Sequence, residues 1–323
     1  MLSIIGIPVA AFVVCAAAGP MLIPFLHKLK FGQSIRECGP QSHLKKSGTP
    51  TMGGLMMLLA VVAALAVFSD FTPAVVIALI LTLGHAVIGF IDDYIKVVMK
   101  RNLGLTAKQK FLMQFILAGA YVYYAETHIQ STALWIPGAN AVVDLGWGYY
   151  VLAFLLLVGT TNAVNLTDGL DGLVSLVSLP VTVTYAVIAL SIGTHADLAG
   201  FALALAGACA GFLLFNHYPA RVFMGDTGSL ALGGGVAALA LLTHTELLLV
   251  IIGGVYVAEA VSVIIQVTYF RITGGRRFFR MAPLHHHFEL GGWKETKVVA
   301  AFTAASFALC LLGLLLWFCR GGI

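Results

Sequence analysis

The feature that most constrains this chain is how little charge it carries along 323 residues. Only 10% of the residues are charged and 60% are hydrophobic, whereas a soluble domain carries about 25% charged residues. Because so few charges cannot cover a surface that faces water, most of the surface must face lipid. At roughly 20 residues per helical span there is room for about ten spans. We therefore expect an all-α polytopic membrane protein, with residues 1–323 forming a single domain.

Apolar runs separated by polar or Pro/Gly breaks predict ten transmembrane helices. Their expected ranges are 3–26, 52–69, 74–92, 110–126, 148–163, 173–192, 198–215, 228–243, 247–270 and 298–319. Residues 127–147 hold no Lys or Arg, and a small hairpin lying on the membrane is expected there, from residues 134–138 and Val142–Val143.

The basic residues predict the orientation of the chain in the membrane. Of the 18 Lys and Arg residues, 17 lie on one face of the ten-span arrangement and only Arg320 lies on the other. Because Lys and Arg accumulate in cytoplasmic loops, the basic face is predicted to be cytoplasmic. Both termini are then periplasmic.

Five of the fourteen acidic residues are expected at cytoplasmic ends of spans or in tight loops there. They are Asp92, Asp93, Asp168, Asp171 and Asp226. Placing a carboxylate among apolar residues at this depth is costly unless it is paired or bound to a metal. The sequence therefore predicts that these side chains converge on a cation, at an active site on the cytoplasmic face.

Asp92 and Asp93 end the third predicted span. Adjacent helical residues point about 100° apart, so the two cannot easily chelate one ion together. One is expected to face the site as a metal partner or base, and the other to orient it. The alternative is an ion-pair ladder on the surface with Lys96 and Lys100.

The segment 162–172 reads Asn-Ala-Val-Asn-Leu-Thr-Asp-Gly-Leu-Asp-Gly. The i, i+3 spacing of Asp168 and Asp171 predicts that both lie on one helix face, about 5–6 Å apart. No Lys or Arg lies in this loop to neutralise them. The spacing does not fit an EF-hand calcium loop, and the structural alternative is a capping role.

Asp226 stands where a helix should begin, next to Thr227 and Ser229, so the alternative for this residue is that it only caps that helix. The sequence Asp-Thr-Gly-Ser resembles an aspartic protease triplet. That fold uses two such triplets, however, and only one is present here, which disfavours a protease.

Two further polar segments suit anions. His285, His286 and His287 lie in the last cytoplasmic loop. Adjacent histidines diverge and rarely bind one Zn²⁺, so we interpret them as hydrogen-bond donors to phosphate or as a proton shuttle; the alternative is an interfacial polar loop. Residues 45–54 place two lysines and hydroxyls before the second predicted span, which suits an anion or a lipid head group.

Acids that hold a divalent metal beside lysines and histidines that hold anions indicate phosphoryl transfer. The lipid setting suggests that one phosphate substrate is itself bound in the membrane. An ion-coupled transporter is the alternative from another class, but transporters place such groups near the midplane of the bilayer, whereas these acids are expected at one end.

In these motifs the chain resembles the polyprenyl-phosphate N-acetylhexosamine-1-phosphate transferases, over essentially its whole length. The Ala-Pro-Leu-His-His-His-Phe-Glu motif favours the muramoyl branch over relatives that use UDP-N-acetylglucosamine, which stay an alternative. The resemblance implies that UDP-N-acetylmuramoyl-pentapeptide and undecaprenyl phosphate react with Mg²⁺ to give lipid I and UMP. It also implies peptidoglycan synthesis at the bacterial inner membrane, and a homodimer.

The resemblance assigns roles to single residues. Asp226 would be a Mg²⁺ ligand, and Asp92 or Asp93 the base for the lipid phosphate. The uridine diphosphate sugar would be bound by Asn165, Asp168 and Asp171, with Phe223 stacking on uracil. The rest of the pocket would be lined by Lys46, Thr51, Lys108, Asn216, Gln266 and the three histidines, His285 to His287. Direct attack by the lipid phosphate is favoured over an aspartyl intermediate, because an ionised phosphate needs little beyond placement.

Overall fold

The computed structural model describes residues 2–28, 46, 48–99, 104–139, 141–193 and 196–320. These residues are mostly helical. The helices are α1 (Leu2–Lys28), α2 (Gly54–Phe68), α3 (Pro73–Val97), α4 (Ala107–Tyr124), α5 (Trp147–Thr167), α6 (Leu173–Ile192), α7 (Ala196–Asn216), α8 (Gly225–Leu242), α9 (Glu246–Ile252), α10 (Gly254–Ile272), α11 (Leu284–Glu289) and α12 (Glu295–Phe318). A π-helical turn, η2 (Ala125–Ile129), follows α4 and leads to strands β1 (Ala133–Ile136) and β2 (Ala141–Asp144).

Nine of the ten predicted spans each coincide with one helix, but not all of these helices have the length and composition of a span. Within the described ranges, eight are long and apolar enough to cross a membrane: α1, α3, α5, α6, α7, α8, α10 and α12. Helix α2 is apolar but has only 15 residues. Helix α4 begins with Lys108 and Lys110 close to its first turn.

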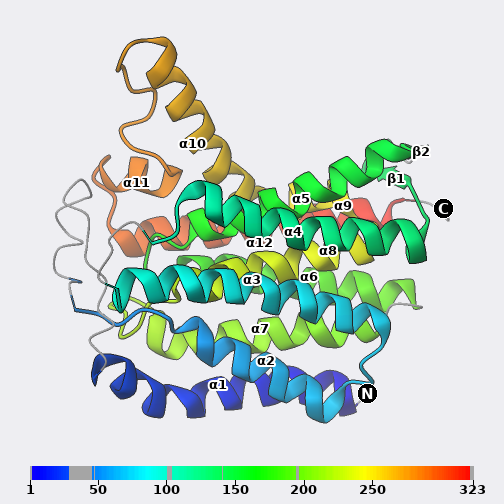
Figure 1. The fold of residues 1–323 in the computed structure, drawn as a ribbon, viewed down its shortest axis with the longest axis horizontal. Coiled ribbons are helices and arrows are strands. Elements are labelled where there is room, and N and C mark those ends of the chain that lie inside the picture. Colours follow the sequence, from blue (N-terminus) through cyan, green and yellow to red (C-terminus); the bar gives the residue numbers. More distant parts are fainter. Residues whose placement is uncertain are drawn as a thin grey trace.

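The prediction of one helix over residues 247–270 is wrong. Helix α9 ends at Ile252 and α10 begins at Gly254, with Gly253 between them. Two consecutive glycines are weak helix formers because they lose the most backbone freedom on folding. The interruption lets α10 lean away from the other helices, as Figure 1 shows.

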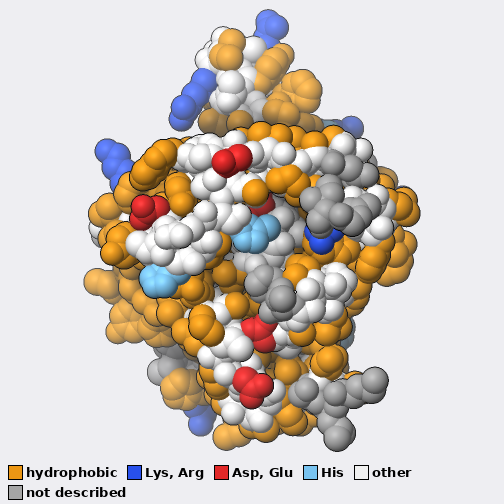
Figure 2. Space-filling model, turned by 90° about the vertical axis from the view of Figure 1, so that its right-hand side faces the viewer, with side chains coloured by type: hydrophobic (Ala, Val, Ile, Leu, Met, Phe, Trp, Pro, Cys, Tyr) orange, Lys and Arg blue, Asp and Glu red, His pale blue; other side chains and the backbone are white. Residues whose placement is uncertain are grey.

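The long helices other than α10 run roughly side by side, and both termini lie at the same end of the molecule (Figure 1). The predicted hairpin is confirmed at that end: β1 and β2 are antiparallel, with Leu134 opposite Val143. Figure 2 views this end of the molecule and shows acidic and histidine side chains among hydrophobic ones, with most basic side chains at the periphery.

Helix α8 is the centre of the bundle. All its residues from Thr227 to Leu242 are buried, and α3 packs along it more extensively than any other pair of helices in the described chain. The helix is rich in Gly and Ala. Small residues let helices approach closely, which matters in lipid because van der Waals packing drives helix association there.

Three of the cysteines, Cys15, Cys209 and Cys310, are buried among the helices. Cys319 is exposed, and Cys38 lies outside the described residues.

The contact between α3 and α8 is closest at Gly89. A Cβ atom added to Gly89 would lie 2.1 Å from the backbone oxygen of Asp226. Only glycine permits this approach, so Gly89 brings the end of α3 against the start of α8. Asp92 and Asp93 follow Gly89 by about one turn and therefore lie beside Asp226.

The substitution Gly89→Val should separate α3 from α8. We expect the free energy of unfolding to fall by about 1–3 kcal/mol, the usual cost of overpacking, measured as a lower thermal midpoint of the purified protein in detergent. The matched control is Gly119→Val in α4, where an added Cβ would meet nothing within 4 Å. Equal midpoints for the two variants would contradict the close contact.

Candidate active site

Three aspartates from two helices meet at the end of the bundle opposite the termini. Asp92 and Asp93 come from the end of α3 and Asp226 from the first turn of α8. Each offers a carboxylate oxygen, and the three oxygens lie within 4.8 Å of one another. Asp92 and Asp93 are only 2% and 3% exposed. The expected convergence is therefore observed for these three, and like charges so close need compensation.

Two lysines supply part of this compensation. Lys96 Nζ lies 2.5 Å from Asp92 Oδ2 and 3.2 Å from Asp226 Oδ2, and Lys110 Nζ lies 2.7 Å from Asp226 Oδ2. The Asp92–Lys96 pair of the ion-pair ladder alternative is thus present, but Lys96 also reaches a second helix. It belongs to the cluster rather than to a surface ladder. Lys100 lies outside the described residues.

Lys110 was not among the predicted site residues. The signal that could have identified it is its spacing from Gln114, because residues at i and i+4 share one helix face. Gln114 is buried, donates to Thr161 Oγ1 at 3.2 Å and accepts from Asn162 Nδ2 at 2.9 Å. A polar pair at this spacing in an apolar helix indicates a face that points into protein.

Asp93 caps α8 from another helix. Its carboxylate accepts hydrogen bonds from the backbone N–H of Asp226 at 3.2 Å, and from the backbone N–H and hydroxyl of Thr227 at 2.9 and 2.7 Å. It therefore satisfies N–H groups that a helix start leaves without partners. The residue in the cap position of α8 is Met224, so the alternative that Asp226 is only a cap is wrong.

The carboxylate of Asp226 instead faces polar groups from three helices. Besides the lysines, Asn165 Nδ2 donates to Asp226 Oδ1 at 2.9 Å and to Ser229 Oγ at 2.8 Å. Asp92 Oδ1 accepts from the backbone N–H of Leu105 at 2.8 Å. Of the two adjacent aspartates, Asp93 thus orients α8, while Asp92 faces Lys96.

Asp168 and Asp171 do not lie on a helix face as predicted. Helix α5 ends at Thr167, and both aspartates lie in the turn 168–172 before α6. The turn follows from Gly172, whose φ of +76° favours glycine. Asp171 Oδ2 accepts from the backbone N–H of Ala220 at 2.9 Å, which ties the turn to the loop before α8.

The cation that pairs with Asp171 comes from far away in the sequence. Lys46 Nζ lies 2.7 Å from Asp171 Oδ1 and 2.5 Å from Glu295 Oε1. Glu295 also accepts from the backbone N–H of Asp171 at 2.8 Å. Glu295 was missed from the sequence, where it lies three residues before the last predicted span, although in the structure it begins α12. Among the described residues, the site therefore holds more carboxylates than lysines, which leaves it negatively charged. The carboxylates are Asp92, Asp93, Asp168, Asp171, Asp226 and Glu295, and the lysines are Lys46, Lys96 and Lys110.

Burial, and then the charges of Asp226, Asp93 and Asp171, raise the pKa of Asp168 to about 8. An aspartate ordinarily titrates near pH 4. The folded chain therefore holds a proton on Asp168 at pH values where an unfolded chain has lost it. The neighbouring carboxylates thus oppose the ionisation of Asp168. A bound cation would offset their charge and stabilise the site.

Other predicted residues connect the segments of the site. Asn216 Oδ1 accepts from the backbone N–H of Gly172 at 3.0 Å, and its Nδ2 donates to Val222 O at 2.9 Å. Phe223 is half-buried, and its backbone bonds to Pro50 and Gly53. Thr51 is buried behind Gly225, where an added Cβ would lie 2.7 Å from its hydroxyl.

The three histidines contact three different partners, although the ring centroids of His285 and His286 lie 4.1 Å apart. His285 Nδ1 lies 3.0 Å from Glu259 Oε1, and His286 Nδ1 lies 2.9 Å from Glu289 Oε2. His287 Nδ1 accepts from the backbone N–H of Arg280 at 3.1 Å. His285 also packs against the turn 168–172, since a Cβ added to Gly169 would lie 2.2 Å from His285 Nε2.

Gln266 and Lys108 lie at the edge of this arrangement. Gln266 Oε1 accepts from the backbone N–H of Phe279 at 2.8 Å, so Gln266 and Glu259 both bind the segment that follows α10. Lys108 is exposed in the first turn of α4.

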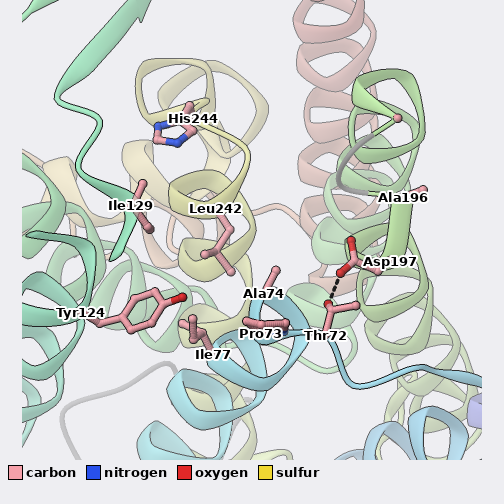
Figure 3. Close-up of a pocket in the computed structure, with 11 residues that line it drawn as sticks. Thr72, Pro73, Ala74, Ile77, Tyr124, Ile129, Ala196, Asp197, Leu242 and His244 are labelled. Carbon is pink, nitrogen blue, oxygen red and sulfur yellow. Dashed lines mark hydrogen bonds between the residues drawn. The ribbon is translucent and has the colours of Figure 1, made fainter. Parts of the chain in front are cut away.

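A separate cavity of about 520 Å³ lies at the opposite end of α3 and α8. It is lined by Thr72, Pro73, Ala74, Ile77, Tyr124, Ile129, Gly193, Ala196, Asp197, Leu242 and His244 (Figure 3). The hydroxyl of Thr72 donates to Asp197, as Figure 3 marks. None of the clustered aspartates lines this cavity.

Comparison with known proteins agrees with the carboxylate cluster. The sequence model of glycosyl transferase family 4 matches residues 73–244. This range includes the five aspartates predicted to form the site: Asp92, Asp93, Asp168, Asp171 and Asp226. The chain therefore belongs to a family of glycosyl transferases, and its long apolar helices are consistent with a membrane protein.

Relatives of the chain narrow this class. The chain is 58% identical to the phospho-N-acetylmuramoyl-pentapeptide-transferase of Heliobacterium modesticaldum, over 95% of this chain and 96% of the relative. It is 53% identical to the enzyme of the same name from Bacillus subtilis, over 94% of each chain. The chain belongs to the phospho-N-acetylmuramoyl-pentapeptide-transferase family, and the resemblance found in its motifs is confirmed.

Lys110 and Lys108 give a direct test of the site. Lys110 contacts Asp226 and Lys108 is exposed, so Lys110→Met should lower transferase turnover by about 10²-fold, as for loss of one electrostatic contact at a reacting centre. We expect Lys108→Met to have the smaller effect. If Lys108→Met lost more turnover than Lys110→Met, Lys108 would line the pocket, as predicted from the sequence, and Lys110 would not.

The raised pKa of Asp168 predicts how the stability of the metal-free protein depends on pH. Because the folded chain keeps this proton up to pH of about 8, its stability should fall as pH rises from about 4 to about 8. Asp168→Asn removes the ionisation, so the thermal midpoint of the variant should fall less over this range. Parallel pH profiles for the two proteins, measured in EDTA, would contradict the assignment.

Proposed function

We propose that this protein transfers phospho-N-acetylmuramoyl-pentapeptide from its UDP conjugate to undecaprenyl phosphate. The products are lipid I and UMP, and the reaction serves peptidoglycan synthesis. The observation that carries this proposal is the cluster of Asp92, Asp93 and Asp226 with Lys96 and Lys110, buried at one end of a bundle of apolar helices. Relatives with the corresponding name cover nearly the whole chain.

The donor set of the cluster fits a magnesium ion. Three carboxylates within 4.8 Å are hard oxygen ligands, and Mg²⁺ binds through one or two carboxylates together with substrate phosphates. We propose Asp226 as the ligand that the protein supplies, because its side chain is the most exposed of the three. When bound, Mg²⁺ would neutralise charge on the diphosphate.

The residues around the cluster have complementary tasks in this proposal. Asn165 fixes the carboxylate of Asp226, and Lys96 and Lys110 attract phosphate oxygens. Asp92 is the stronger candidate for the base, since the hydrogen bonds of Asp93 are used on the start of α8. The donor lies along the turn 168–172, with Phe223 against the uracil ring.

The reaction proposed is a direct displacement. An oxygen of undecaprenyl phosphate attacks the phosphorus that carries the sugar, a new P–O bond forms, and the bond between the two phosphates of the donor breaks. UMP leaves with the electron pair. Lys96 and Lys110 hold positive charge where negative charge gathers during this transfer, and the helices exclude water that would hydrolyse the donor.

The chain is proposed to be one domain with ten crossings of the bacterial inner membrane. The ten-span arrangement places the basic loops and the aspartates in the cytoplasm and both termini in the periplasm. This is supported by the position of both termini at one end (Figure 1) and by Arg320 as the one basic residue predicted there. A homodimer is expected from the family resemblance.

The experiment that tests this function measures UMP release by the purified protein from UDP-N-acetylmuramoyl-pentapeptide and undecaprenyl phosphate. We expect release that stops in EDTA and returns on addition of Mg²⁺. UDP-N-acetylglucosamine, added in excess, should neither be turned over nor compete.

Each other outcome would contradict a different part of the proposal. Turnover of UDP-N-acetylglucosamine would make the chain a sister transferase. Undiminished release in EDTA would remove the metal from the mechanism. Solute movement in reconstituted vesicles, with no UMP release in detergent, would favour an ion-coupled transporter.

A further inference from the structure

Glu259 and His285 form a buried acid–imidazole pair beside the candidate site. Both side chains are almost fully buried, at 0% and 1% exposed. Glu259 Oε1 lies 3.0 Å from His285 Nδ1, and Glu259 Oε2 accepts from the backbone N–H of His285 at 3.5 Å. The pair joins α10 to α11 through two residues that lie 26 positions apart in the sequence.

The contact determines which ring nitrogen of His285 carries a proton. A carboxylate only accepts hydrogen bonds, so Nδ1 must be the protonated nitrogen that donates to Glu259. Nε2 is then the nitrogen left for another partner. In the same way, a carboxylate behind a histidine fixes its tautomer and ring orientation in other enzymes.

His285 Nε2 is buried and has no hydrogen-bond partner in the described structure. A buried polar atom without a partner is costly to the fold, and a catalytic or binding role is one explanation for keeping it. Nε2 points at the turn 168–172: a Cβ added to Gly169 would lie 2.2 Å from it. This is the turn that carries Asp168 and Asp171.

We propose that Glu259 is a positioning residue that acts through His285. It fixes the ring so that Nε2 is presented for a hydrogen bond with the nucleotide-sugar donor bound along the turn 168–172. The inference rests on the proposed function, because it takes the donor to lie along that turn. Gly169 contributes to this arrangement, because a side chain at that position would displace the imidazole ring of His285.

The test is a double-mutant cycle on UMP release. Glu259→Ala should lower kcat by roughly 10- to 100-fold, the usual effect of losing a carboxylate that orients a functional histidine, and should change KM for the donor much less. His285→Ala should lower kcat at least as far. If Glu259 acts only through His285, adding Glu259→Ala to the His285→Ala variant should cause no further loss.

Losses that multiply in the double variant would overturn the inference, because Glu259 would then act independently of His285. Wild-type turnover in Glu259→Ala would overturn it as well. If Glu259→Ala fails to fold, the same cycle is made with Glu259→Gln, which keeps the size of the side chain and loses its charge. The same non-additivity with His285→Ala is expected.

Glu246→Gln is the matched control. Glu246 is another fully buried glutamate, at the opposite end of α8, where Tyr149 donates to it at 2.5 Å. This variant should lower the thermal midpoint without a selective loss of kcat. Absence of UMP release by the wild-type protein would refute the proposed function itself. Release by the wild type with an additive cycle would refute only the role of Glu259.

Discussion

The structure depends on the burial of negative charge where α3 meets α8. Carboxylates in an apolar bundle are tolerated only when other groups compensate them, and here each has a specific partner. Asp93 binds the N–H groups that start α8, while Asp92 and Asp226 share Lys96. The close approach at Gly89 makes these contacts geometrically feasible. Helix packing and the charge balance of the site are therefore one feature.

Much of the fold followed from the sequence, because membrane burial imposes a simple pattern. Apolar runs located nine of the ten predicted helices, and turn residues between two short apolar segments located the hairpin at β1 and β2. The meeting of Asp92, Asp93 and Asp226 could also be inferred. A buried carboxylate needs a partner, and three carboxylates at the same end of two predicted helices can share one cation.

The parts that sequence reasoning missed depend on contacts between distant segments. Local spacing suggested a helix face for Asp168 and Asp171, but α5 ends at Thr167 and a turn with Gly172 at positive φ follows. The break between α9 and α10 likewise follows from a pair of glycines whose effect depends on the surrounding packing. No local pattern could show that Lys110 reaches Asp226 or that Glu295 reaches Asp171.

The bridge from Lys46 through Glu295 to the turn 168–172 has a consequence for biogenesis. Lys46 precedes α2, whereas Glu295 begins α12, so the bridge joins an early segment of the chain to its last helix. A growing chain emerges N-terminus first. The turn 168–172 is therefore synthesised before Glu295, which accepts a hydrogen bond from the backbone N–H of Asp171. The contact between Lys46, Glu295 and Asp171 can therefore form only after α12 has been synthesised.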